Sequence, residues 1–263
     1  MEALSIKSVE MNLIDMPVMG ESLQGSVTWM AKALKVEEAQ VVLSLDVWRT
    51  DSRVTEAQRL DISCCQDRLQ SQINGLVQTV ATFLGANWDS RQIDIEERDH
   101  NSDDADAFID ISPSDAEHVV LPLPSYIGLL QCSDLGLNGL VEHELQLRKG
   151  QANDVLHEIQ LALADKAVLF CTDVRQGRNY TMKSHAWRKV ADLDGVVKRY
   201  ATVYQQCQRQ MIALGVDSSI LNQYKPLNQN DLTVSTAVAD PNARGHHHDS
   251  LAWFWTIDIL KDN

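Results

Sequence analysis

One run of side chains near the end of the sequence has residue types that could hold a metal ion. His246, His247 and His248 stand next to Asp249, and neutral imidazole is a frequent metal ligand in proteins. Consecutive residues of an extended loop point in different directions, so three neighbouring histidines rarely converge on one ion. The run is therefore more typical of a solvated polar loop, and we expect no metal site here.

A second candidate for metal chemistry is the acidic segment from 86 to 118, which carries 11 Asp or Glu residues and 2 Arg residues. Its spacing does not match an EF-hand loop, which needs regularly alternating acids, a glycine and a distant glutamate. A block of like charges repels itself and buries too little apolar surface to offset the entropy of ordering the chain. The pattern predicts an acidic flexible linker over residues 86–121.

Nucleophilic or acid–base catalysis would need side chains that are tied together by a motif. Cys64 and Cys65 are adjacent, but Cys65 falls on a helical apolar stripe, where a cysteine acts as a small hydrophobic residue. His143, His157 and His185 lie in helical runs, and no spacing joins them to a nucleophile or a carboxylate pair. We therefore assign no catalytic residue and no cofactor, and we expect a protein that is not an enzyme.

Cations form the last group with a chemical role. The chain has a net charge of -14, yet residues 139–214 carry 11 Lys or Arg residues and 8 acids. The candidate nucleic-acid contacts are Arg175, Arg178, Lys183, Arg188 and Lys189, with Tyr180, His185 and Trp187 as stacking groups between them. Arg148 and Lys149 are further candidates at the opposite end of the same region. The alternative is that all of these are ordinary solvated cations, and the acidic chain as a whole does not suit a general nucleic-acid binder.

Two amphipathic helices position these cations. Apolar residues recur at steps of three and four, as expected for one side of a helix, at Ala152, Val155, Ile159, Leu163, Ala167 and Phe170, and at Trp187, Val190, Leu193, Val197, Ala201, Tyr204, Met211 and Leu214. The break at 175–181 contains glycine and asparagine and is short enough to make the two helices antiparallel neighbours. We expect this second hairpin, with short flanking helices, to span residues 122–225.

A first helical hairpin is predicted over residues 22–85. Its second helix opens with the capping-box pattern Thr55-Glu-Ala-Gln58 and reaches a stop at Gly85. A nearly heptad stripe runs along it at Ile62, Cys65, Leu69, Ile73, Leu76, Val80 and Phe83. The predicted fold is all-α, with long, coiled-coil-like antiparallel hairpins joined by the acidic linker. Residues 1–21 form a poorly ordered lead-in, and residues 226–263 form a loop-rich tail whose terminal aromatic cluster suggests a truncated chain.

The seams of such hairpins can close on a second copy of the chain, so self-association is one expected interaction. DNA contact at the apex of the second hairpin is the other. No apolar run approaches the ~20 residues that a membrane span needs, and the first 30 residues do not form a signal peptide. We expect an intracellular protein with no membrane contact.

Six stretches in a defined order complete the sequence evidence, namely Leu34–Gln40, Arg68–Ile73, Leu123–Gly128, Leu147–Leu156, Val234–Arg244 and Ser250–Trp255. Together they resemble the C-terminal helical region of fungal Kyakuja-Dileera-Zisupton (KDZ) transposases and partial copies of them, from about residue 22 onward. The metal-binding ribonuclease-H-like core of that family has no counterpart in this sequence. The resemblance implies a nuclear, non-catalytic scaffold or assembly module, as a degenerate or partial transposase copy. The alternative is a nucleic-acid-contacting module.

Overall fold

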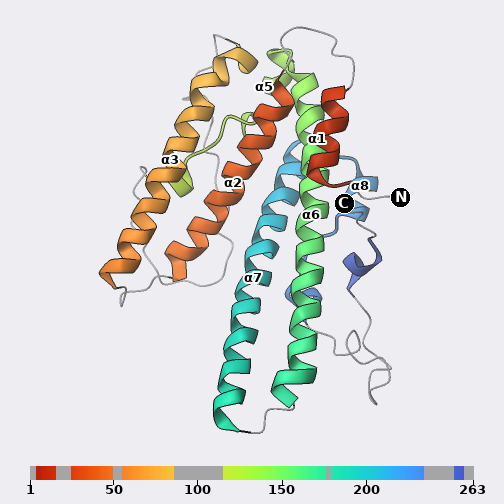
Figure 1. The fold of residues 1–263 in the computed structure, drawn as a ribbon. Coiled ribbons are helices and arrows are strands. Elements are labelled where there is room, and N and C mark those ends of the chain that lie inside the picture. The colour runs from red at the N-terminus through yellow and green to blue at the C-terminus, as the bar shows by residue number, and fades with distance from the viewer. Residues whose placement is uncertain are drawn as a thin grey trace, which may run out of the picture. The chain divides into compact units, whose positions relative to one another are not determined.

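The regular elements of the chain are helices (Figure 1). The computed structural model describes residues 4–15, 25–49, 55–85, 115–175, 179–233 and 252–257, and these ranges contain no strand. The predicted all-α class is thus confirmed. None of the helices in these ranges has the length and apolar character needed to cross a lipid bilayer.

The chain divides into two compact units, which are described separately. Unit 1 comprises Met1–Asn12, Gln146–Ile212 and Val216–Asn263, and unit 2 comprises Leu13–Leu145 and Ala213–Gly215. Helix α6 (Asn138–Leu169) belongs to both, because it begins in unit 2 and continues in unit 1.

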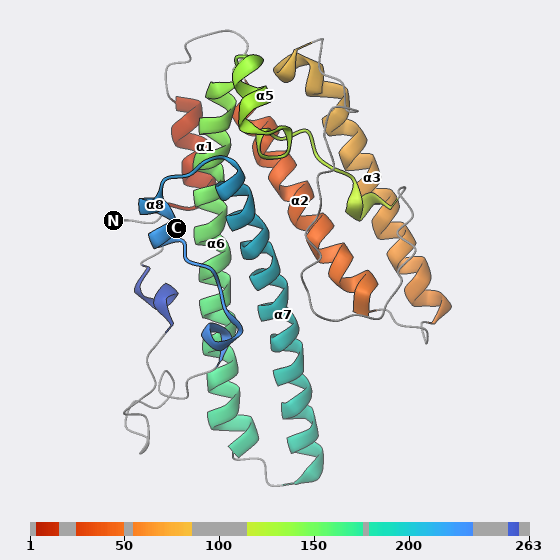
Figure 2. The same ribbon diagram turned by 180° about the vertical axis from the view of Figure 1, so that it is seen from behind.

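Two long helices form the body of unit 2, α2 (Ser26–Arg49) and α3 (Glu56–Leu84). They lie side by side in both views of the ribbon (Figures 1 and 2). Trp29, near the start of α2, packs its ring 5.2 Å from that of Phe83, near the end of α3, so the helices are antiparallel. The predicted capping box opens α3, since the Thr55 hydroxyl accepts from the Gln58 amide and the Gln58 side chain accepts from the Thr55 amide. Gly85 ends the helix with a φ of 90°, a conformation that glycine adopts without strain.

The prediction that the flexible linker extends to residue 121 is wrong for residues 115–121. Here a short 3-10 turn, η3 (Ala116–His118), packs against both α2 and α3. Ala116 and Leu121 are buried, and the buried amide of Gln40 donates to the carbonyls of Ala116 and Val119 at 2.9 and 2.7 Å. This packing supplies the stabilisation that the local sequence lacks. The rest of the predicted linker, residues 86–114, lies outside the described ranges.

Short helices complete unit 2 after η3. Pro124 occupies the first turn of α4 (Pro124–Ile127), where its missing N–H costs nothing. Gly128, with a φ of 93°, joins α4 to α5 (Leu129–Asp134). The fully buried carboxylate of Glu144 accepts hydrogen bonds from the amide and the hydroxyl of Ser125, which ties the start of α6 to α4.

Helices α6 and α7 (Tyr180–Ala213) form the body of unit 1 and lie antiparallel (Figures 1 and 2). Contacts along them pair early residues of one with late residues of the other. The Cys207 thiol donates to the Arg148 carbonyl at 3.2 Å, and the ring of Phe170 lies 5.7 Å from that of Trp187. Most of the predicted stripe is buried, but Trp187 is 51% exposed. Between the helices, the π-helical turn η4 (Phe170–Val174) extends α6 toward the apex.

The prediction of a poorly ordered lead-in over residues 1–21 is wrong for residues 6–15, which form helix α1 (Ile6–Asp15). Its first turn is held by unit 1. The Ile6 amide donates to Asp154 at 3.0 Å, and the buried Asn153 amide donates to the Leu4 carbonyl at 2.9 Å. These contacts come from residues more than a hundred positions further along the chain, so the local sequence cannot show them.

The tail packs on unit 1 where the structure describes it. Helix α8 (Ser218–Gln223) and the 3-10 turn η5 (Gln229–Leu232) follow α7. The 3-10 turn η7 (Trp253–Thr256) then inserts Phe254, which is fully buried. The Gln160 amide of α6 donates to the Phe254 carbonyl at 2.7 Å, so the aromatic cluster belongs to the core of this unit.

Candidate interaction groove and basic apex

An open groove runs along α2 and α3 in unit 2. Two hollows of about 850 and 410 Å³ form it, and they share Lys35, Ala39 and Gln72 as lining residues, so they are continuous. The floor is apolar and repeats every seven residues on both helices, at Trp29, Val36 and Leu43 on α2 and at Leu69, Leu76 and Phe83 on α3. A heptad floor on two antiparallel helices is the surface on which a further helix packs.

The rims of the groove repeat with the same period. At steps of seven residues, the α2 rim carries Lys32, Ala39 and Asp46, and the α3 rim carries Cys65, Gln72 and Thr79. The lining of α2 extends from Thr28 to Asp46, which corresponds to about 27 Å at ~1.5 Å per residue. The groove is long enough for a partner helix of several turns.

Small residues keep the middle of the groove open. Ala39 lies on the α2 side and Gly75 on the α3 side. Among the described residues, no atom lies within 4 Å of where a Cβ would stand at Gly75, so these residues leave this part of the groove open. The backbone of an incoming helix could therefore approach α3 closely at this point.

The two ends of the α2 rim differ in charge. Lys32 is exposed toward one end, whereas Asp46 lies at the other. Asp46 pairs with Arg49 at 3.8 Å in a half-exposed i,i+3 contact, and pairs of this kind contribute little to stability. The groove thus has an electrostatic direction along its length.

The groove was not predicted from the sequence, and the prediction that Cys65 is a small core residue is wrong. Both Cys64 and Cys65 are exposed, and Cys65 lines the rim, where a buried core position was predicted. The heptad stripe could have signalled the groove, because Cys65, near the start of the stripe, is exposed. Cys132, by contrast, is fully buried, and burial, followed by the charge of Glu144, raises the pKa of its thiol to about 11. That thiol stays protonated at neutral pH and is not a reactive nucleophile.

The predicted nucleic-acid residues lie at the apex of α6 and α7, except Arg178, which is outside the described ranges. Arg175, Lys183 and Arg188 are exposed. Lys189 pairs with Asp173 at 3.1 Å, so its charge is partly neutralised. Tyr180 is 88% exposed, which leaves a ring available for stacking.

The two cations predicted at the opposite end are not part of such a surface. Arg148 is fully buried, and its guanidinium donates to Gln151 at 3.3 Å. Lys149 is half-buried. Arg148 therefore serves the interior of unit 1 and cannot reach a phosphate backbone.

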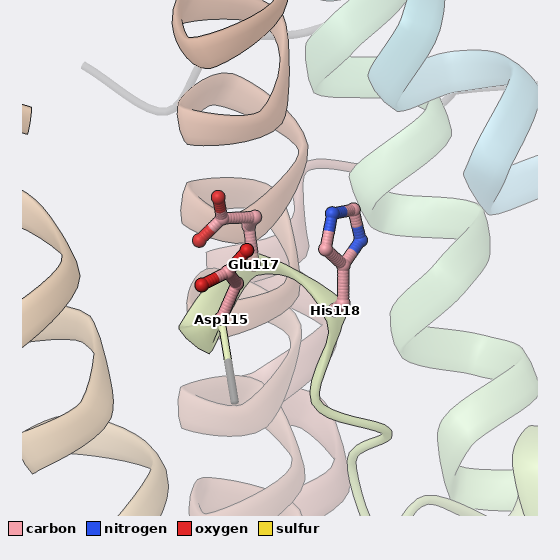
Figure 3. A group of neighbouring side chains, drawn as sticks. All are labelled: Asp115, Glu117 and His118. Atoms are coloured by element: carbon pink, nitrogen blue, oxygen red, sulfur yellow. The ribbon is translucent and has the colours of Figure 1, made fainter. Parts of the chain in front are cut away.

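A cluster of metal-ligand types occurs at η3, where Asp115, Glu117 and His118 place one donor atom each within 4.8 Å of the others (Figure 3). The Gln66 amide on α3 donates to both carboxylate oxygens of Glu117, at 3.1 and 3.2 Å. This buried carboxylate thereby anchors η3 to α3, and we assign the cluster to packing. The predicted polar loop at 246–249 lies outside the described ranges.

The three histidines of the helical runs form no metal-ligand group among the described residues. His143 is in unit 2, while His157 and His185 are in unit 1 on different helices. The Nδ1 atom of His143 is buried and makes no hydrogen bond. Burial lowers the pKa of this imidazole against the opposing effect of Glu142, so it is neutral at pH 7.

Comparisons with models of protein families, with curated proteins and with solved structures give no match to this chain.

Proposed function

We propose that this chain is a non-catalytic helical assembly module whose α2–α3 groove takes up a helix of a partner. One observation carries the proposal: both the floor and the rims of an open, apolar groove repeat every seven residues over about 27 Å at ~1.5 Å per residue. Side chains of a helix recur with this period, so a partner helix can place apolar residues along the whole floor.

The floor residues have the chemistry that such packing needs. Trp29, Val36, Leu43, Leu69 and Leu76 are each less than a tenth exposed in the unoccupied groove. A helix laid over them would remove the remaining apolar surface, including that of the half-buried Phe83, from water. Each Å² of apolar surface so covered contributes about 25 cal/mol to association.

The resemblance to the helical region of KDZ-type transposases supports the same role. In such a protein the helices outside the catalytic core would assemble chains rather than carry out chemistry. We propose that this chain is a degenerate or partial copy that retains the accessory helices.

The proposal is tested by a groove-blocking variant of the full chain, Gly75→Glu. The Cβ of the new side chain would meet no atom of the described residues within 4 Å, so we expect α3 to remain folded. Asn74→Glu is the matched control, because it adds the same charge one residue away, outside the groove lining, at an exposed position.

Tagged wild-type and variant chains would be expressed in the source cells, cross-linked and purified, and the retained chains identified by mass spectrometry. We expect wild type and Asn74→Glu to retain the same chains, additional copies of the protein included, and Gly75→Glu to lose them. Equal retention by all three would contradict the proposal.

A second function, nucleic-acid contact at the apex, is favoured by one observation. Tyr180 is 88% exposed and stands in the sequence between the exposed Arg175 and Lys183, an arrangement of cations and a ring that suits single-stranded nucleic acid. The full-length triple variant Arg175→Ala, Lys183→Ala, Arg188→Ala tests this function. It would lower both the affinity for DNA and the steepness of its salt dependence. No retention of the wild type on DNA at low salt would remove this second function.

A further inference from the structure

We infer that the occupant of the α2–α3 groove is the same groove of a second copy, so that two chains form a four-helix bundle around a two-fold axis. This inference rests on the proposed function, because it names the partner of the same groove. In such a dimer each surface patch contacts its own counterpart. The groove must therefore be complementary to itself, and its rim charges can be checked for that property.

The α2 rim meets the requirement. Two α2 helices can be laid antiparallel about a two-fold axis at Ala39. Each residue then lies opposite the residue of the other chain for which the two residue numbers add up to 78. Lys32 of one chain then faces Asp46 of the other, and the same pair recurs on the opposite side of the axis. Val36 faces Val42, so apolar residues lie between the two ion pairs. Opposite charges therefore meet at these two points of the dimer.

The residue on the axis also suits close packing. Ala39 faces its own counterpart, and its small side chain lets the two α2 backbones approach. This alanine is half-buried in the single chain, so it has surface left to cover.

The α3 rim is compatible with the same axis. Gln72 lines both hollows together with Ala39, so both residues lie where the two hollows join, and the axis through Ala39 passes near Gln72. In the dimer Gln72 therefore faces Gln72 of the second chain, and a side-chain amide can both donate and accept. Arg68 falls opposite Leu76, close to Gly75, so the two arginines are separated from each other.

A partner of different sequence could also lie in this groove, and charge exchange separates the two cases. Lys32→Glu or Asp46→Lys alone places like charges opposite each other at two points of the dimer. The double variant Lys32→Glu, Asp46→Lys restores opposite charges, but only where both residues face copies of the same chain. If the partner were a different protein whose binding relied on either charge, the double variant would not restore that binding.

The experiment is sedimentation equilibrium of the purified full chain over a concentration series. We expect a dimer for wild type, a dissociation constant at least tenfold higher for each single variant, and recovery to within threefold of wild type for the double variant. Gly75→Glu should be monomeric and Asn74→Glu dimeric. Circular dichroism of every variant checks that the helices remain folded.

Thiol labelling gives an independent measure on the folded chain. Cys65 lines the groove and its neighbour Cys64 does not, although both are exposed. In a Cys64→Ser chain the labelling rate of Cys65 should fall several-fold as the protein concentration rises through the dimer range. In a Cys65→Ser chain the rate at Cys64 should stay constant.

Three results would overturn the inference: a wild type that remains monomeric, a dimer that tolerates Gly75→Glu, or a double variant as weak as the singles. A monomeric wild type that still retains a different chain through the groove would refute only the two-fold dimer. The assembly function would then stand with another partner.

Discussion

Gly150 on α6 lies directly against the backbone of Ile6 on α1: a Cβ at position 150 would stand 2.7 Å from the Ile6 Cα and 2.9 Å from the Ile6 nitrogen. These atoms belong to backbone and cannot rotate away. The glycine therefore permits the approach of a helix that precedes it by more than a hundred residues. Gly75 on α3 is also inside a helix, but its surroundings are open.

The two glycines should respond to alanine with opposite signs. Gly75→Ala should raise the free energy of unfolding by about 0.5–1 kcal/mol, because alanine loses less conformational entropy in a helix. Gly150→Ala should lower it by about 1–3 kcal/mol, because α1 must shift and its bonds to Asp154 and Asn153 are strained. Urea denaturation measures both, and a stabilising Gly150→Ala would contradict the close approach.

Gln40 should be the residue on which the packing of η3 depends most. Its amide serves the carbonyls of Ala116 and Val119, and Gln40→Met keeps the volume while removing both donors. We expect the free energy of unfolding to fall by about 1–3 kcal/mol, because the two carbonyls lose their donors. Hydrogen exchange over residues 115–121 should become faster. Gln70→Met is the control. Its exposed bond to Asn74 should contribute little, so equal losses in the two variants would argue against a special role for Gln40.

Phe254 should hold the C-terminal turn η7 on unit 1. Its side chain is fully buried, and its ring lies 5.8 Å from that of Trp253. Phe254→Ala should lower the free energy of unfolding by about 3–5 kcal/mol if η7 and the helices of this unit unfold together. If η7 unfolds separately, only residues 252–257 should gain hydrogen exchange. Unchanged stability together with unchanged exchange in this turn would show that it does not pack as described.

Alkaline pH should destabilise the chain through Tyr224. Burial, with a smaller contribution from Cys207, raises the pKa of Tyr224 to about 12 against the lowering effect of its hydrogen bond to Asn153. The unfolded chain releases this proton near pH 10, before the folded chain does. Above that pH the folded state binds more protons than the unfolded state, so stability declines between about pH 10 and 12. The buried Tyr204, whose pKa is raised by burial first, and Cys132 act in the same direction.

Tyr224→Phe isolates this effect. The variant removes the 3.0 Å hydrogen bond that the Tyr224 hydroxyl donates to Asn153. This should lower the free energy of unfolding at pH 7 by about 1–3 kcal/mol. Its stability should then fall less steeply than that of wild type between pH 10 and 12. Parallel curves of unfolding free energy against pH would show that Tyr224 does not titrate differently in the folded state.

The sequence by itself determined where the long helices lie and which side of each is apolar. The stripe from Ala152 to Ala167 and the capping box at Thr55 both appear in the structure as predicted. Helical periodicity and capping depend on residues three or four positions apart, so they can be recognised without knowledge of the fold.

Only the tertiary structure decided which apolar residues are covered and which segments without a strong pattern become ordered. Ala116 and Leu121 are buried because α2 and α3 supply surface and donors for η3, and α1 is held by residues from α6. Arg148 is buried while Arg188 is exposed, although each is followed by a lysine within a long helix. Burial is set by what lies across the helix in space, and for the groove the described residues supply no such second surface.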